Sequence, residues 1–208
     1  MKNIEEYILK HMTEEPAVLK ELHRETHSRI YNPQMCSGHF QGMALRFISQ
    51  MIQPQLILEI GTFTGYSTIC LAAGLLPGGR VFTIESNPEL EEMINAYLQK
   101  ANVDNKVNVY FGDALDIIPR FTEMFDLVFM DADKREYLDY FNILIDKVRP
   151  GGFIIADNVL WSHKILEQET RDPQTRALIE FNDMIQLDPR VENMIWPIRD
   201  GWMVMRKK

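Results

Sequence analysis

Oxygen-bearing side chains follow two short apolar runs in the second half of the chain. Asp131 comes directly after the run 125–130, and Asp157 and Asn158 come directly after the run 153–156. If these runs are neighbouring strands, about 4.8 Å apart, the three side chains can converge on one point. Three oxygen donors without His or Cys suit a hard cation, foremost Mg²⁺, with Ca²⁺ or Mn²⁺ as alternatives. A second interpretation is that these residues only cap helices, as Asp and Asn commonly do.

Lys134 follows Asp131 by three residues, so on an opening helical turn both side chains lie on one side. A lysine beside a divalent cation is shifted toward the neutral amine, which is the form that a general base requires. We therefore interpret Lys134 and Asp131 as the candidate catalytic pair. The alternative for Lys134 is a solvated surface position, the usual environment of this residue type.

A short glycine loop, GTFTG at 61–65, follows an earlier apolar run at 56–60. Gly61 and Gly65 permit a tight turn and close approach of the backbone to a ligand. The third glycine of G-x-G-x-x-G is missing, so pyrophosphate has a poorer cradle than in a dinucleotide site. Glu85 ends the next run and can accept hydrogen bonds from both ribose hydroxyls of a nucleoside. The loop therefore favours a nucleoside with little phosphate over a plain strand-to-helix turn.

Two further groups of residues invite a functional interpretation. The segment HRETH at 23–27 has its acidic residue third rather than second, which departs from the H-E-x-x-H order of zinc metalloproteases. We interpret it as helix surface. Trp161 and His163 lie just after Asp157 and Asn158 and are candidates to line a pocket for a flat ring. The alternative is an aromatic side chain that covers the sheet edge.

Apolar runs that alternate with helix-period segments predict the elements that position these groups. Strands are predicted at 56–60, 81–84, 107–111, 125–130 and 153–156. Helices are predicted between them, one with Leu90 to Ala101 and one with Tyr137 to Val148 on an apolar face. Buried strands interleaved with helices are typical of a parallel sheet covered on both faces. In such a sheet, ligands bind beyond the carboxyl ends of the strands.

The two ends of the chain predict helices and a closing hairpin. One early helix runs from Pro16 toward Arg29 and another begins near Ser37. A later helix starts at Asp172, and an Asp-Gly turn at 200–201 joins two strands, 191–197 and 202–205. The last strand is then antiparallel to its neighbour. With no repeat or linker-like tract, residues 1–208 are predicted to form one domain with N-terminal helices over about 1–52.

Composition limits the partners and the compartment. The 208 residues include 22 Lys and Arg against 30 Asp and Glu, a net charge of −8. This charge argues against a nucleic-acid partner, because such binding draws most of its non-specific affinity from clustered Lys and Arg. No run approaches the roughly eighteen apolar residues of a membrane span, and the first residues have no apolar signal core. Cys36 and Cys70 form no C-x-x-C spacing. We expect a cytoplasmic protein without a membrane partner.

In order and spacing, these motifs resemble those of the cation-dependent O-methyltransferases typified by the caffeoyl-CoA and catechol O-methyltransferases. The resemblance extends from about Glu14 to Lys208 and is carried by LEIGTFTGYS (58–67), MDADK (130–134), ADNVLW (156–161) and the closing Asp-Gly (200–201). It implies an α/β fold that is Rossmann-like and doubly wound, with a mostly parallel seven-stranded sheet and an antiparallel last strand. It also implies a homodimer that transfers a methyl group from S-adenosylmethionine to oxygen.

The resemblance implies roles for individual residues. The expected S-adenosylmethionine contacts are Ser37, Glu59, Gly61, Thr62, Gly65, Ser67, Glu85, Asp113, Ala114 and Asp131. The expected metal ligands are Asp131, Asp157 and Asn158, and the expected base is Lys134. Substrate contacts are expected from Met35, Trp161 and Asp200.

The expected acceptor is a small phenolic molecule with vicinal hydroxyls. Plant caffeoyl-CoA enzymes contact their substrate through an N-terminal extension that this sequence lacks, which argues against a CoA thioester. Met203 stands where catechol methyltransferases keep a glutamate. Two alternatives stay open at this point. One is an NAD-type Rossmann oxidoreductase, disfavoured by the missing third glycine, and the other is a non-catalytic S-adenosylmethionine-binding module, disfavoured by the carboxylate cluster.

Overall fold

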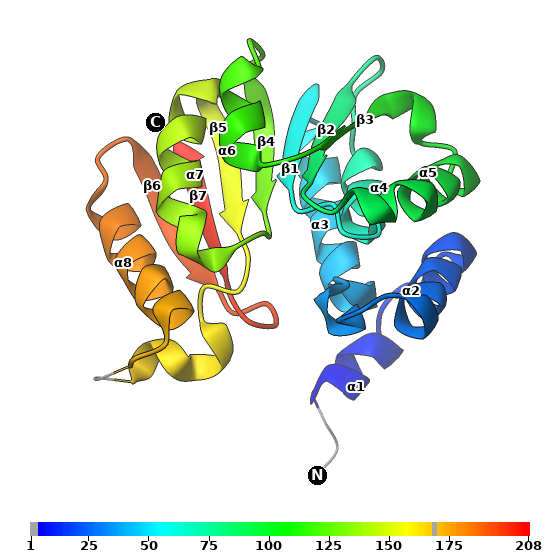
Figure 1. The fold of residues 1–208 in the computed structure, drawn as a ribbon, viewed down its shortest axis with the longest axis horizontal. Coiled ribbons are helices and arrows are strands. Elements are labelled where there is room, and N and C mark those ends of the chain that lie inside the picture. The colour runs from blue at the N-terminus through cyan, green and yellow to red at the C-terminus, as the bar shows by residue number, and fades with distance from the viewer. Residues whose placement is uncertain (1–3, 168–169) are drawn as a thin grey trace.

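A seven-stranded sheet forms the centre of the computed structural model, which describes residues 4–167 and 170–208 (Figure 1). The strand order is β3-β2-β1-β4-β5-β7-β6. The strands are β1 Leu56–Ile60, β2 Arg80–Glu85, β3 Val107–Phe111, β4 Phe125–Met130, β5 Val148–Ala156, β6 Val191–Trp196 and β7 Trp202–Lys207. Strands β1 to β5 pair in parallel, and β7 pairs antiparallel with both β5 and β6. The predicted fold class is confirmed.

Helices cover both faces of the sheet (Figure 1). The α-helices are α1 Ile4–Lys10, α2 Ala17–Arg29, α3 Gly38–Ile52, α4 Tyr66–Ala72, α5 Glu91–Lys100, α6 Ala114–Ile117, α7 Tyr137–Leu144 and α8 Pro173–Leu187. Short 3-10 helices are η1 Pro33–Met35, η2 Pro88–Leu90, η3 Asp104–Lys106, η4 Ile118–Arg120, η5 Lys134–Glu136, η6 Ile145–Lys147 and η7 Trp161–Leu166. None of the helices in the described ranges combines the length and apolar character that a bilayer crossing needs.

The alternation of side chains along each strand builds two cores. In β4, Val128 and Met130 pack in one core with α6, α7 and α8, whereas Leu127 and Phe129 pack in the other with α2, α3, α4 and α5. Successive residues of a strand point to opposite faces, so a strand buried on both sides must be apolar throughout. This is why β4 was visible in the sequence as a continuous apolar run.

The strand boundaries differ most from the prediction at the start of β5. The helix predicted to reach Val148 ends at Leu144, and Val148 instead begins β5, five residues before the predicted strand start. Pro150 lacks a backbone N–H, so it cannot continue a helix. The pairing of β4 with β5 also shifts register between Phe125 and Leu127, and this irregular stretch holds the proline and two glycines. The prediction therefore placed Val148 in a helix and left 149–152 unassigned, where the structure has the start of a strand.

Candidate active site

A cavity of about 910 Å³ lies beyond the carboxyl ends of β1, β2, β3, β4 and β5. This volume is near the upper end of the range for small-molecule sites, roughly 300–1,000 Å³. Most of the predicted site residues line it: Met35, Ser37, Gly61, Thr62, Ser67, Glu85, Asp113, Ala114, Asp131, Lys134, Asp157, Asn158 and Trp161. The structure thus brings together residues that the sequence placed at separate strand ends.

The glycine loop packs directly against the end of β4. Gly61 has φ +97°, a conformation that favours glycine, and its N–H donates to the Ile84 carbonyl at 3.0 Å. A Cβ atom built on Gly61 would lie 2.0 Å from the carbonyl oxygen of Asp131. The absence of a side chain at this position therefore lets the loop after β1 meet the first acidic residue of the site.

Glu85 ties this loop to the end of β2. Its carboxylate accepts hydrogen bonds from the backbone N–H of Phe63 at 2.7 Å and of Asn87 at 2.9 Å. Burial raises the pKa of Glu85, and these backbone donors oppose that shift. Each carboxylate oxygen carries two lone pairs, so acceptor capacity remains for ribose hydroxyls in the cavity.

Glu85→Gln is expected to weaken binding of S-adenosylhomocysteine by about 1–3 kcal/mol, because one amide N–H of the glutamine would face a backbone donor and a charged acceptor is lost. Isothermal titration calorimetry with S-adenosylhomocysteine measures the change. Glu89→Gln is the matched control, since Glu89 is exposed on the turn that follows. An unchanged dissociation constant for Glu85→Gln would remove this residue from the cofactor site.

Three of the predicted contacts lie outside the cavity lining. Glu59 is fully buried below it, where one carboxylate oxygen accepts hydrogen bonds from the Thr68 and Thr83 hydroxyls and the other has no partner among the described residues. Burial raises the pKa of Glu59 to about 7. Gly65 has φ +91° and caps α4. Glu59 therefore connects β1 to β2 and α4, and Gly65 makes the turn from the loop into α4.

Asp200 also lies outside the lining and supports the opposite wall. Its side chain accepts a hydrogen bond from the Ser162 N–H, and its carbonyl accepts one from the Leu160 N–H at 2.9 Å. Trp161 lies between these two residues and does line the cavity, whereas the exposed His163 does not. The hairpin turn therefore holds the loop that carries Trp161.

The two acidic strand ends lie side by side. Met130 and Ala156 are paired across β4 and β5, and the Asp157 N–H donates to the Met130 carbonyl at 2.9 Å. Asp131 is half-buried and Asp157 is 1% exposed. Burial, reinforced by repulsion from Asp131, raises the pKa of Asp157 to about 7. Two carboxylates this close repel each other, so a bound positive charge between them is favoured.

The donor set at this point fits a hard cation. It consists of two carboxylates and the side-chain amide of Asn158, which has φ +62° and follows Asp157 directly. Oxygen-only donors are those that Mg²⁺, Ca²⁺ and Mn²⁺ prefer. Within residues 4–167 and 170–208, no group of three His, Cys, Asp or Glu side chains is placed to share an ion. A cation here would therefore depend on Asn158, solvent or substrate for its remaining ligands.

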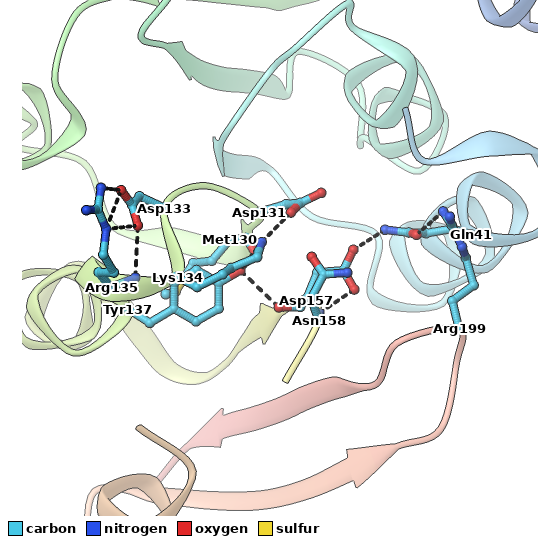
Figure 2. Close-up of polar contacts among 10 residues, drawn as sticks. All are labelled: Gln41, Met130, Asp131, Asp133, Lys134, Arg135, Tyr137, Asp157, Asn158 and Arg199. Atoms are coloured by element: carbon cyan, nitrogen blue, oxygen red, sulfur yellow. Dashed lines mark hydrogen bonds and ion pairs between the residues drawn. The ribbon is translucent and has the colours of Figure 1, made fainter. Parts of the chain in front are cut away.

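Lys134 is buried and held as an ammonium by its neighbours (Figure 2). Its Nζ donates to Asp131 Oδ1 at 2.7 Å and to the Tyr137 hydroxyl at 2.8 Å. Burial lowers the pKa of Lys134, but attraction from Asp131, Tyr137 and Asp157 outweighs it and raises the pKa above the ordinary lysine value. The protein groups alone therefore favour the charged form of Lys134, whereas the neutral amine was predicted for Lys134 beside a divalent cation.

Tyr137, Gln41 and Arg199 are site residues that the sequence did not reveal. The Tyr137 hydroxyl lies 2.9 Å from the Asp157 carbonyl and 3.2 Å from the Met130 carbonyl, so it braces both acidic strand ends. Gln41 and Arg199 line the cavity and connect to Asp157 (Figure 2). Of these three residues, only Gln41 could have been found from the sequence. It is a polar residue on the helix face that also carries Leu45 and Ile48, and a polar side chain on a buried face indicates a specific partner.

Comparison with known protein families gives a consistent set of relatives. A family model described as O-methyltransferase matches residues 9–208. A catechol O-methyltransferase of Niastella koreensis is 35% identical over 159 residues, which are 74% of this chain and 72% of the relative. A caffeoyl-CoA O-methyltransferase of Petroselinum crispum is 32% identical over 206 residues, which are 93% of this chain and 85% of the relative.

Solved structures agree with these relatives. An O-methyltransferase from Bacillus cereus in complex with SAH superposes with a TM-score of 0.91 at 30% identity, covering 99% of this chain and 97% of that one. The O-methyltransferase TomG from Streptomyces achromogenes in complex with SAM superposes with a TM-score of 0.89 at 29% identity, covering 99% of this chain and 96% of that one.

Proposed function

Because this chain belongs to the O-methyltransferase family of the caffeoyl-CoA and catechol type, we propose that it methylates one hydroxyl of a catechol-like aromatic with the help of a divalent cation. Its dependence on S-adenosylmethionine as methyl donor follows from the family and its solved relatives. The oxidoreductase and the non-catalytic module are thereby set aside. The observation that carries the finer proposal is the pair of carboxylates at adjacent strand ends inside this cavity.

The cavity offers different chemistry at its two ends. Glu85 supplies acceptors for ribose hydroxyls, and the loop at 61–65 lets the backbone approach the nucleoside closely. Ser37, at the start of α3, and Ser67, in α4, also line the cavity. A sulfonium donor carries positive charge rather than phosphate, so a short loop without a pyrophosphate cradle is sufficient. S-adenosylmethionine supplies the methyl group when it is bound.

The acceptor end is built for a pair of hydroxyl oxygens. Asp131, Asp157 and Asn158 would hold the cation, which when bound lowers the pKa of hydroxyls that it contacts. Lys134 lies at the same wall and can take or share the released proton once it is neutral. Neutralising the charge of Asp131 removes a principal attraction that keeps Lys134 protonated. Fixed positions for donor and acceptor in one cavity then lower the barrier by orientation.

An assay of the purified enzyme with S-adenosylmethionine tests the proposal. We expect catechol and caffeate to be methylated when Mg²⁺ or Mn²⁺ is supplied, and the products to disappear when a chelator removes the cation. Resorcinol is the matched control, because its two hydroxyls are not adjacent and cannot share one cation. The CoA ester of caffeate is included to test whether a thioester is accepted. Turnover of catechol that resists the chelator, or equal turnover of resorcinol, would contradict the proposal.

A further inference from the structure

A continuous chain of hydrogen bonds joins the β6–β7 turn to Asp157 (Figure 2). Arg199 Nη1 donates to Gln41 Oε1 at 2.8 Å, and Gln41 Nε2 donates to Asp157 Oδ2. The three residues come from the turn before β7, from helix α3 and from the end of β5. Gln41 and Asp157 stand 116 residues apart in the sequence, so only the tertiary fold creates this connection.

The donor and acceptor types fix the direction of the chain. A guanidinium can only donate, so Arg199 requires the oxygen of the Gln41 amide to face it. The Nε2 group of Gln41 must then face Asp157, which can only accept while it is ionised. Arg199 Nη1 also donates to the Ser37 carbonyl, and within the described chain Arg199 forms no ion pair that would compete.

These contacts hold both oxygens of the Asp157 carboxylate. Oδ1 accepts the Asn158 N–H at 2.6 Å, and Oδ2 accepts the Gln41 amide. With one donor on each oxygen, rotation of the carboxylate about its χ2 angle is restricted. Gln41 is 2% exposed and Asp157 is 1% exposed, so water does not readily replace a lost donor.

We propose that Gln41 and Arg199 form a positioning relay that orients the Asp157 carboxylate toward the cavity. Gln41 acts on Asp157 directly, and Arg199 acts through Gln41 by fixing the direction of its amide. The role of this orientation in cation binding rests on the function proposed above. Neither residue takes part in the chemical step, in contrast to Lys134.

A double-mutant cycle with Gln41→Met and Arg199→Met tests the relay. Binding of Mn²⁺ to the protein, followed by electron paramagnetic resonance with and without S-adenosylhomocysteine, reports on Asp157 without any turnover. We expect Gln41→Met to weaken Mn²⁺ binding by about 10–100-fold, the usual loss when a partner of a metal ligand is removed. Arg199→Met should cause a smaller loss, and in the Gln41→Met background it should cause no further loss.

Two further variants separate positioning from simple space filling. Gln41→Glu keeps an acceptor for Arg199 but removes the donor to Asp157, so it should lose Mn²⁺ affinity at least as strongly as Gln41→Met. Rescue by Gln41→Glu would show that cation binding does not need an amide donor to Asp157 and would overturn the relay. Gln50→Met on the exposed end of α3 and Arg206→Met on β7 are the matched controls, and both should bind Mn²⁺ as the wild type does.

The outcomes for the relay and for the proposed function can be told apart. If the wild type binds no Mn²⁺, the cation-dependent function fails, and the relay is judged by melting temperatures of the same cycle. Non-additive changes in melting temperature between Gln41→Met and Arg199→Met would still support the relay, and additive changes would overturn it. If wild-type binding is normal but Gln41→Met binds Mn²⁺ equally well, the relay is wrong. A loss in Arg199→Met that is confined to acceptors with a carboxylate, with catechol turnover intact, would instead make Arg199 a substrate contact.

Discussion

Asp157→Asn is expected to abolish methyl transfer to catechol while binding of S-adenosylhomocysteine stays unchanged. The substitution keeps the shape of the side chain and its acceptor for the Asn158 N–H, but it removes one of two negative charges at the adjacent strand ends. Mutating a residue that hydrogen-bonds to a metal ligand typically lowers activity by about 10–100-fold. Loss of a metal ligand itself should therefore lower activity by more than this. Steady-state methylation assays and calorimetric titration of S-adenosylhomocysteine measure the two quantities separately.

Asp139→Asn on the exposed face of α7 is the control, because it removes a carboxylate that does not line the cavity. The thermal melting of both variants shows whether the fold is intact. If Asp157→Asn loses affinity for S-adenosylhomocysteine together with turnover, Asp157 is a structural residue. If the variant retains turnover, the acidic strand ends do not form the cation site.

The sequence predicted the strands best where the sheet is most buried. Strand β4 spans the predicted residues 125–130 because both of its faces pack in a core, which requires an unbroken apolar run. The start of β5 was missed because Pro150, Gly151 and Gly152 normally interrupt strands. They are tolerated here where the β4–β5 register shifts.

Site residues were predictable when topology alone brings them together. Asp131 and Asp157 end neighbouring parallel strands, so any such sheet places them side by side. Arg199 and Tyr137 reach the same point from a hairpin turn and from a helix, and their approach depends on packing that no local pattern encodes. The protonation of Lys134 likewise depends on three neighbouring groups, Asp131, Tyr137 and Asp157, which its spacing from Asp131 does not reveal.

In the glycine loop, a residue that looks like part of a local turn motif is required by a contact with a distant part of the chain. Gly61 and Gly65 both adopt positive φ values, +97° and +91°, and look equivalent in the sequence. A Cβ atom on Gly61 would lie 2.0 Å from the Asp131 carbonyl oxygen, whereas one on Gly65 would meet no heavy atom within 4 Å. A substitution at either position would therefore strain the backbone in the same way. Only at Gly61 would the added Cβ atom also collide with the end of β4.

Gly61→Ala is accordingly expected to disrupt the site, and Gly65→Ala is its matched control. The left-handed conformation alone costs a residue with a Cβ atom about 1–2 kcal/mol, and this is the loss of unfolding free energy expected for Gly65→Ala, with S-adenosylhomocysteine binding retained. For Gly61→Ala the loop must separate from β4 as well, so the loss should be several kcal/mol, and binding of S-adenosylhomocysteine should fall below detection. Denaturant unfolding and calorimetry measure both effects. Equal losses of unfolding free energy and of S-adenosylhomocysteine binding in the two variants would mean that the loop adjusts to the added Cβ atom. The close contact between Gly61 and Asp131 would then not be needed for the site.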